Sequence, residues 1–195
     1  MPALENLSIS AASPSLWGKL RRTFRPAEVS IVAAAFDFAV QHGALDERNI
    51  ERPSEASFNP RPARVAEIVL SGNHDVTSLQ VAAAILLCAE ELPSKSLPAE
   101  LEEAYQTCAA ARRSLSDNSP PPDELTASLL LAYMLDDVRH FHMKRDFLAQ
   151  LDKELPQFES RWRSYSALAP RSKVSALTAH AIERLKRFRE DPRHE

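Results

Sequence analysis

Glycine is scarce in this chain, with 3 residues among 195, whereas proline occurs 14 times. So few glycines leave little room for β-hairpin turns or for the glycine-rich loops that hold phosphates. The prolines fall between apolar segments, as they do at helix boundaries. No segment shows a sustained alternation of apolar and polar residues, and the sequence has no internal repeat. The sequence therefore predicts an all-α protein.

Other absences narrow the class of protein. The chain has only two cysteines, Cys88 and Cys108, which lack the spacing of a disulfide framework and indicate a reducing, cytoplasmic setting. No apolar run reaches the length of a membrane span, so we expect no membrane partner. The net charge of −3 argues against a general nucleic-acid binder. The first sixteen residues lack the pattern of a secretory signal, although their Ser and Ala content also suits an effector-type export signal.

The length suits one domain rather than two. We expect a loosely ordered segment with a short helix over 1–25, a single-domain helical bundle over 26–190, and a tail over 191–195. Within the domain, apolar spacing predicts helices over 26–42, 62–71, 79–87, 98–115, 125–147 and 170–188. The segment 79–87 is apolar on all sides, which is typical of a central helix. Pro156 is expected to kink or end any helix that contains it.

Four motifs follow one another along the chain. They are Phe38-Ala39, then Arg61-Pro62 with Val65-Ala66-Glu67-Ile68-Val69, then Asp75 with Leu79-Gln80 and Ala82-Ala83-Ala84-Ile85-Leu86-Leu87, and finally Leu131-Ala132-Tyr133-Met134-Leu135-Asp136-Asp137-Val138-Arg139. In order and spacing they resemble the landmarks of the hydrolase domain of the RelA/SpoT alarmone enzymes and the small alarmone hydrolases. The resemblance implies an all-α HD fold and, in an active member, hydrolysis of (p)ppGpp-type nucleotides with Mn²⁺.

The residues that would hold the metal are missing. In the resembling family, imidazoles and carboxylates bind a divalent cation that activates a water molecule. Here Arg61 stands at the His of the His-Pro pair, and Tyr133 stands at the Asp of the Leu-Ala-Asp motif. The segment around Cys88, where the His-Asp pair belongs, contains neither residue type. The resemblance therefore predicts a catalytically inactive protein with no metal cofactor, which acts as a regulatory binding module for a protein or a nucleotide.

The candidate residues of this degenerate pocket are Arg61, Arg64, Cys88, Glu90, Glu91, Tyr133, Asp137 and Arg139. An arginine such as Arg61 can grip a phosphate as a fork, or it can fill the vacated metal site and pair with Glu90 or Glu91. The sequence leaves both roles open. We expect Cys88 to be an inert buried thiol and Arg139 to pair with a nearby acid.

An active metal-dependent phosphohydrolase is the first alternative. It would need a rebuilt Mn²⁺ site, for which His74, Asp75, Asp136 and His140 are the candidates. Asp136 and His140 are four residues apart and so share one side of a helix. For both pairs we favour a structural role over metal binding. We expect His74 and Asp75 to lie in a loop and the Asp136 cluster to lie on the surface.

A second alternative is an all-α interaction or secreted effector protein that is unrelated to HD enzymes. It predicts that the segments around Arg61, Cys88 and Tyr133 do not meet in one pocket. The sequence does not identify the partner or the oligomeric state.

Overall fold

Helices form the regular structure of the part of the chain that the computed structural model describes, which is residue 9 and residues 13–44, 60–72, 75–143 and 146–190. In chain order they are α2 (Pro14–Thr23), α3 (Pro26–Gln41), α4 (Arg61–Gly72), α5 (Ser78–Leu87), the 3₁₀ turns η3 (Ser94–Ser96) and η4 (Ala99–Leu101), α6 (Glu102–Ser116), α7 (Glu124–Arg139), the 3₁₀ turn η5 (Phe141–Met143), α8 (Phe147–Leu168) and α9 (Lys173–Glu190). These ranges contain no strand, which confirms the all-α prediction. None of their helices combines the length and apolar character needed to cross a bilayer.

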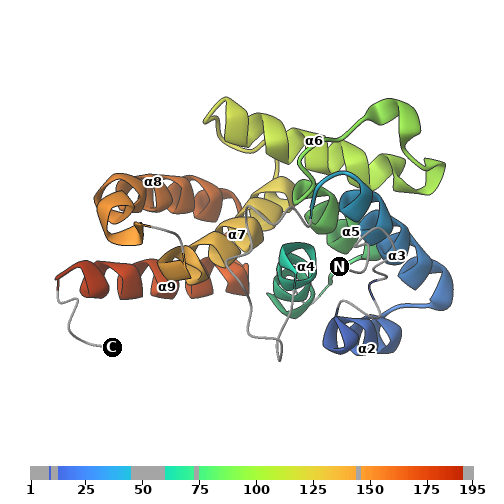
Figure 1. The fold of residues 1–195 in the computed structure, drawn as a ribbon, viewed down its shortest axis with the longest axis horizontal. Coiled ribbons are helices and arrows are strands. Elements are labelled where there is room, and N and C mark those ends of the chain that lie inside the picture. The colour runs from blue at the N-terminus through green and yellow to red at the C-terminus, as the bar shows by residue number, and fades with distance from the viewer. Residues whose placement is uncertain (1–8, 10–12, 45–59, 73–74, 144–145, 191–195) are drawn as a thin grey trace.

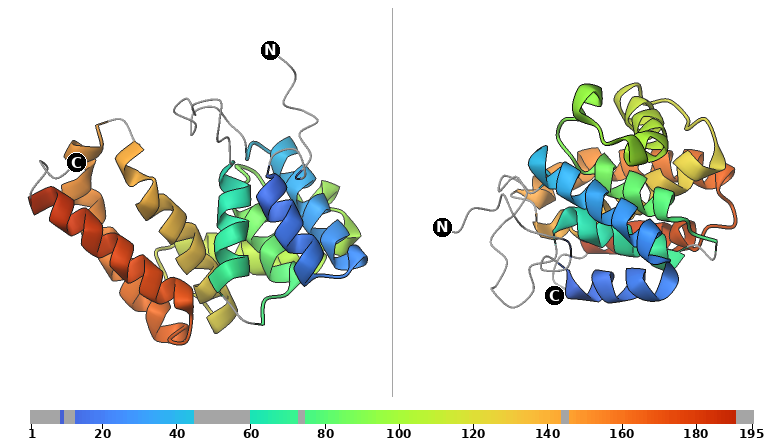
Figure 2. Two further views of the ribbon diagram at one scale, coloured as in Figure 1. Left: turned by 90° about the horizontal axis from the view of Figure 1, so that it is seen from below. Right: turned by 90° about the vertical axis from the view of Figure 1, so that its right-hand side faces the viewer.

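Helix α7 lies at the centre of the molecule and contacts both of its halves (Figure 1). On one side it packs against α4, α5 and α6, and α3 and α2 lie beyond them. On the other side it packs against the hairpin of α8 and α9 (Figure 2). Buried apolar side chains from both halves belong to one continuous cluster. The described helices therefore share a single core, as expected for a helical bundle.

Helix α5 is the buried helix that the sequence predicts. Every residue from Val81 to Leu87 is buried, because α3, α4 and α6 surround the helix. The helix begins with a capping box, in which the Thr77 hydroxyl accepts from the Gln80 N–H at 3.3 Å and the Gln80 side chain accepts from the Thr77 N–H at 2.9 Å. Thr77 thus caps the helix, and Asp75 lies exposed ahead of it.

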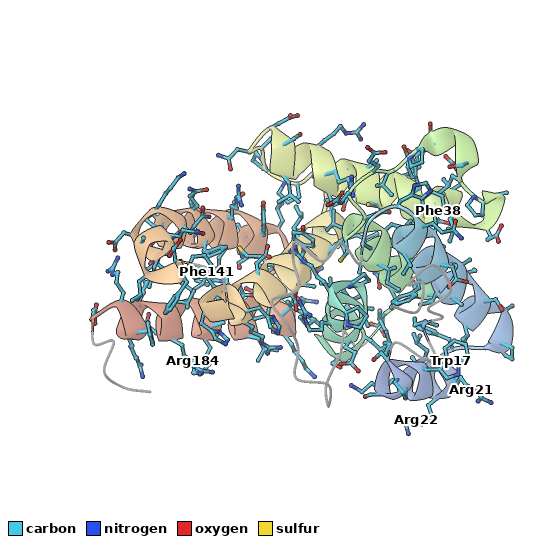
Figure 3. All side chains as sticks on the ribbon, viewed as in Figure 1. Trp17, Arg21, Arg22, Phe38, Phe141 and Arg184 are labelled. Atoms are coloured by element: carbon cyan, nitrogen blue, oxygen red, sulfur yellow. The ribbon has the colours of Figure 1, made fainter. Side chains whose placement is uncertain are left out.

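The prediction of one helix from Leu125 to Phe147 is wrong. Helix α7 ends at Arg139, and Phe141 then turns into the core between α8 and α9 (Figure 3). The Phe141 ring meets the ring of Phe158 edge to face, with centroids 5.6 Å apart. Asp146 adopts a left-handed backbone with φ of 56°, and α8 starts at the next residue. Burial of Phe141 therefore outweighs continuation of the helix.

Of the two effects expected of Pro156, a kink or an end, the structure excludes the end of the helix. Helix α8 runs through it without interruption. Proline lacks the N–H that would bond the carbonyl of Asp152, but both residues are exposed and water can reach that carbonyl. Further along α8, the Trp162 indole donates to the Ser175 carbonyl of α9 at 3.1 Å, which joins the two helices of the hairpin.

Gly72 lies at a close contact between the two halves. It is the last residue of α4 and is buried against Val174 in the first turn of α9. A Cβ atom at this position would overlap Cγ2 of Val174. Glycine therefore lets the start of α9 reach the end of α4.

Candidate functional site

The first turn of α4, the end of α5 and the last turns of α7 meet in one place. The Arg61 guanidinium carbon lies 4.0 Å above the centroid of the Tyr133 ring, in cation–π geometry. The Cys88 thiol at the end of α5 is close enough for the Arg61 charge to act on it. The expectation that these three segments would stay apart, which belongs to the unrelated-protein alternative, is wrong.

Arg61 pairs with carboxylates of α7. Its Nη2 donates to Oδ1 of Asp137 at 2.6 Å, and its Nε lies 3.7 Å from Oδ2 of Asp136. The Nε atom is buried without a hydrogen-bond partner. The predicted pairing of Arg61 with Glu90 or Glu91 is therefore wrong, because the two aspartates of α7 lie nearer to it along the α4 interface.

Asp136 is the most buried charge of the cluster, with a side chain that is 2% exposed. Arg64 binds it with two bonds, from Nε to Oδ1 at 2.8 Å and from Nη2 to Oδ2 at 3.0 Å. His140 places Nδ1 3.2 Å from Oδ1. The prediction that this cluster is a surface patch is wrong for Asp136, since the fork of Arg64 satisfies the carboxylate inside the interface.

The charges of the cluster reinforce one another. Burial alone would raise the pKa of Asp136, but hydrogen bonds from His140 and Arg64 outweigh burial and lower the pKa to about 2. Burial would lower the pKa of Arg61, and Asp137 is the main neighbour that raises the pKa above its ordinary value. Asp136 therefore remains a carboxylate and Arg61 remains a cation at any physiological pH.

Cys88 and Tyr133 are neutral under the same conditions. Burial raises the pKa of the Cys88 thiol to about 12, against the opposing effect of the Arg61 charge. Burial likewise raises the pKa of Tyr133 to about 12. The thiol donates only a weak hydrogen bond to the Ala84 carbonyl at 3.5 Å. This environment fits the inert thiol that we expect of Cys88 and does not activate a nucleophile.

Glu90 and Glu91 follow α5 and are exposed. The His42 carbonyl at the end of α3 accepts from their backbone N–H groups, at 2.9 Å for Glu90 and 3.5 Å for Glu91. Arg112 of α6, which the sequence did not single out, donates to the carbonyls of Ala89 and Glu90. It thereby satisfies carbonyls beyond the end of α5. No spacing signal marks Arg112, because its partners are backbone atoms.

Only part of the alternative metal site lies among the described residues. His74 lies outside the described residues, and Asp75 is exposed ahead of α5. Asp136 and His140 do lie together, but Arg64 occupies both oxygens of the carboxylate. Within the described ranges, no group of three or more His, Cys, Asp or Glu side chains has the arrangement of a metal site.

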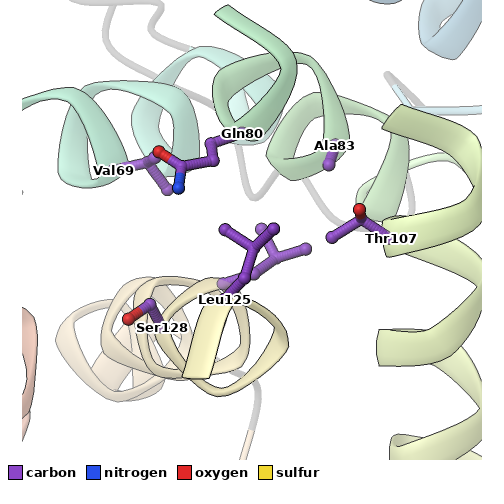
Figure 4. A pocket seen from close by; sticks show the side chains of 7 residues that line it. Val69, Gln80, Ala83, Thr107, Leu125 and Ser128 are labelled. Carbon is purple, nitrogen blue, oxygen red and sulfur yellow. The ribbon is translucent and has the colours of Figure 1, made fainter. Parts of the chain in front are cut away.

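A groove of about 310 Å³ lies beside the Arg64–Asp136 pair, between α2, α4, α7 and α9. Its lining includes Lys19, Arg64, Asp136, Arg139, His140 and Leu177. Arg139 is exposed and has no partner among the described residues, so its expected ion pair with an acid is not seen there. A second hollow, between α4, α5, α6 and α7, measures about 10 Å³ and has room for little more than one water molecule (Figure 4).

Comparison of the chain with protein-family models, with curated proteins and with solved structures found no match.

Proposed function

We propose that this protein is a catalytically inactive, HD-type helical module of the alarmone-hydrolase kind, which binds a protein or a nucleotide in the cytoplasm in a regulatory role. The carrying observation is the position of the Arg61 guanidinium, between the Tyr133 ring and the carboxylates of Asp136 and Asp137. It lies where α4, the end of α5 and α7 meet, which is where the resemblance implies a metal ion.

The groups around Arg61 favour the loss of metal chemistry. A guanidinium has no lone pair for a metal and repels a cation. The neighbouring Cys88 and Tyr133 are neutral, because burial raises the pKa of each to about 12. Asp136 is bound through both oxygens by Arg64. A divalent ion would have to displace two arginines to reach this carboxylate.

The same contacts favour one of the two roles left open for Arg61. They indicate that it fills the vacated metal site and does not bind a phosphate. Its Nη2 donates to Asp137 at 2.6 Å, and its flat face covers Tyr133. A phosphate would have to compete with Asp137, whose carboxylate is already in place. Under this proposal, binding of a partner or a nucleotide uses another surface of the module.

Metal analysis together with phosphate release tests the proposal. The purified protein is incubated with Mn²⁺, its bound metal is measured, and phosphate release is followed with guanosine tetraphosphate and with guanosine triphosphate. We expect no stoichiometric manganese and no turnover, and the same result for Arg61→His, because the other ligands are missing too. Stoichiometric manganese together with phosphate release by the unaltered protein would reject the proposal in favour of the active phosphohydrolase.

A restored site tests the scaffold itself. Because Cys88 lies beside Arg61, we assign the lost His-Asp pair to Cys88 and Ala89. The variant with Arg61→His, Cys88→His, Ala89→Asp and Tyr133→Asp should gain manganese binding. The matched control keeps Arg61 and carries the other three changes, and it should bind none. If the variant with all four substitutions folds but does not bind manganese, the result would contradict the HD-type assignment.

A further inference from the structure

The groove between α2, α4, α7 and α9 adjoins the Arg61 cluster, since Arg64, Asp136 and His140 line it and Arg61 does not. In the left view of Figure 2, the ribbons of α7 and α4 lie between those of α9 and α2. The apolar part of the lining comes from Ile68, Leu135 and Leu177, and Leu177 is 44% exposed. A volume of about 310 Å³ falls at the lower end of small-molecule sites. The groove thus has the size for a small ligand with an apolar or neutral part.

The carboxylates that line the groove already have cationic partners. Glu67 lies 3.4 Å from Nζ of Lys19, and Asp136 is held by Arg64. Arg139 remains, with an exposed guanidinium that has no partner among the described residues. The lining therefore carries one positive charge in excess of its carboxylates. A cation of this kind, beside an apolar surface, attracts an anionic group.

His140 adds a second group that can hold an anion. Its Nδ1 lies 2.8 Å from the carbonyl oxygen and 3.2 Å from Oδ1 of Asp136, which fixes the ring. Its Nε2 has no partner among the described residues, and the side chain is 36% exposed. A protonated imidazole donates from both nitrogens. With Nδ1 held by Asp136, the Nε2 N–H of the doubly protonated ring can donate to a ligand oxygen beside Arg139.

Helix α9 extends the positive face beyond the groove. Arg184 follows Leu177 by seven residues, which places both on one side of the helix. In Figure 3, Arg184 projects from the same side of the molecule as Arg22 of α2. Arg184 is exposed, and none of the described acids pairs with it. Arg184 therefore adds positive charge on the α9 side, outside the residues that line the groove.

We infer that this groove binds a small polyanion, with one phosphate or carboxylate group between Arg139 and His140 and a neutral part over Ile68 and Leu135. The inference rests on the proposed binding role and not on the loss of the metal site. It names the chemistry of the ligand, and the phosphate and carboxylate sources are separated by experiment.

Titration calorimetry of the full chain with inorganic pyrophosphate and with citrate tests the inference. We expect saturable binding of at least one of the two anions, weakened by added salt. Arg139→Gln should weaken that binding about tenfold or more, because a charge-assisted hydrogen bond is lost. Arg113→Gln is the matched control, since Arg113 is an exposed arginine of α6, which does not line the groove. It should leave the affinity unchanged, and the circular dichroism of both variants should match that of the unaltered protein.

Tighter binding of pyrophosphate would assign the site to phosphates, and tighter binding of citrate would assign it to carboxylates. The inference is overturned if neither anion binds, if Arg139→Gln binds as well as the unaltered protein, or if Arg113→Gln loses as much affinity as Arg139→Gln. Manganese binding and phosphate release are measured separately. A protein that binds no anion but is free of metal and inactive would contradict the groove and leave the proposed function standing.

Discussion

Two neighbouring parts of the α4–α7 interface differ in how their charges are used. At the start of α4, which we call the closed end, Arg61 and Arg64 meet Asp137 and Asp136 of α7, so that two cations face two carboxylates. The groove adjoins this contact, because Arg64 and Asp136 line it, and it reaches Ser71 and Gly72 at the open end of α4. Arg139 also lines the groove and has no carboxylate partner among the described residues. The same pair of helices thus combines a closed ionic contact with a groove that carries an unmatched cation, which attracts anionic ligands.

Removing the charge of Asp136 should break the closed end most severely. Asp136→Asn leaves Arg64 without its carboxylate and removes the nearest partner of the Arg61 Nε atom. We expect a loss of about 3–5 kcal/mol in the free energy of unfolding, measured by urea denaturation.

The matched control for Asp136→Asn is Asp137→Asn. The Asp137 side chain is 28% exposed, so water can replace much of what the change removes. We expect a loss of about 1 kcal/mol. Equal losses for the two variants would contradict the view that burial sets Asp136 apart.

A methyl group at Gly72 should disturb the open end alone. In Gly72→Ala the new Cβ overlaps Cγ2 of Val174, so α9 must move away from α4. We expect a loss of up to about 3 kcal/mol in thermal or urea unfolding. Val174→Ala in the same chain should recover part of it.

Gly18→Ala serves as the comparison for Gly72→Ala. Gly18 lies inside α2, and a Cβ there meets no atom within 4 Å. Alanine favours the helix over glycine, so we expect a gain of up to about 1 kcal/mol. A loss at Gly18 as large as that at Gly72 would show that the close contact with Val174 is not the cause.

Acid should weaken the closed end and, through Asp136, the adjoining wall of the groove. The pKa of Asp136 is about 2 in the folded protein, below its ordinary value of 3.8. A lowered folded-state pKa stabilises the protein above pH 4, and that contribution is lost as the pH falls from about 4 toward 2. We expect this carboxylate to account for about 2 kcal/mol of the free energy of unfolding that is lost in acid. Urea denaturation at several pH values should show this loss of stability in the unaltered protein and not in Asp136→Asn.

Arg61→Met should have the smallest effect of the series. Methionine keeps contact with Tyr133, Asp137 is partly solvated, and Asp136 retains Arg64 and His140. We expect the free energy of unfolding to change by no more than about 1 kcal/mol. Calorimetry with guanosine nucleotides completes the comparison, because equal heats for Arg61→Met and the unaltered protein would exclude Arg61 as a phosphate ligand. A loss of nucleotide binding together with unchanged stability would favour the phosphate fork.

Periodicity and capping predict most of the helices correctly. The uniformly apolar stretch of α5 indicates a central position, and Thr77 provides a recognisable cap. The end of α7 could not be predicted, because the residues after Arg139 continue a helical pattern while Phe141 is drawn toward Phe158. That contact is tertiary, so local spacing carries no sign of it. The exposure of Asp152, which lets α8 continue through Pro156, is likewise a property of the folded molecule.

The sequence predicts which segments form the site, but it does not predict the contacts between their residues. The motif order anticipates that the regions of Arg61, Cys88 and Tyr133 come together, and the structure brings them together. It does not anticipate which carboxylate pairs with which arginine, since Asp136 and Asp137 are consecutive and differ only by about 100° around the helix axis. The groove depends on residues as distant in sequence as Lys19 and Leu177. No pattern within a single helix could indicate it.

The central place of α7 has a consequence for dissection of the chain. Its loop from α6 contains Pro120 and Pro122, both exposed, so a cut there would separate α2–α6 from α7–α9. The first fragment would lack the helix that covers the inner faces of α4, α5 and α6, and the second would expose the apolar side of α7 that normally lies against them. Each piece would thus present a surface complementary to the other, and reassembly of the two from separate chains would follow from apolar contact alone, without any covalent link.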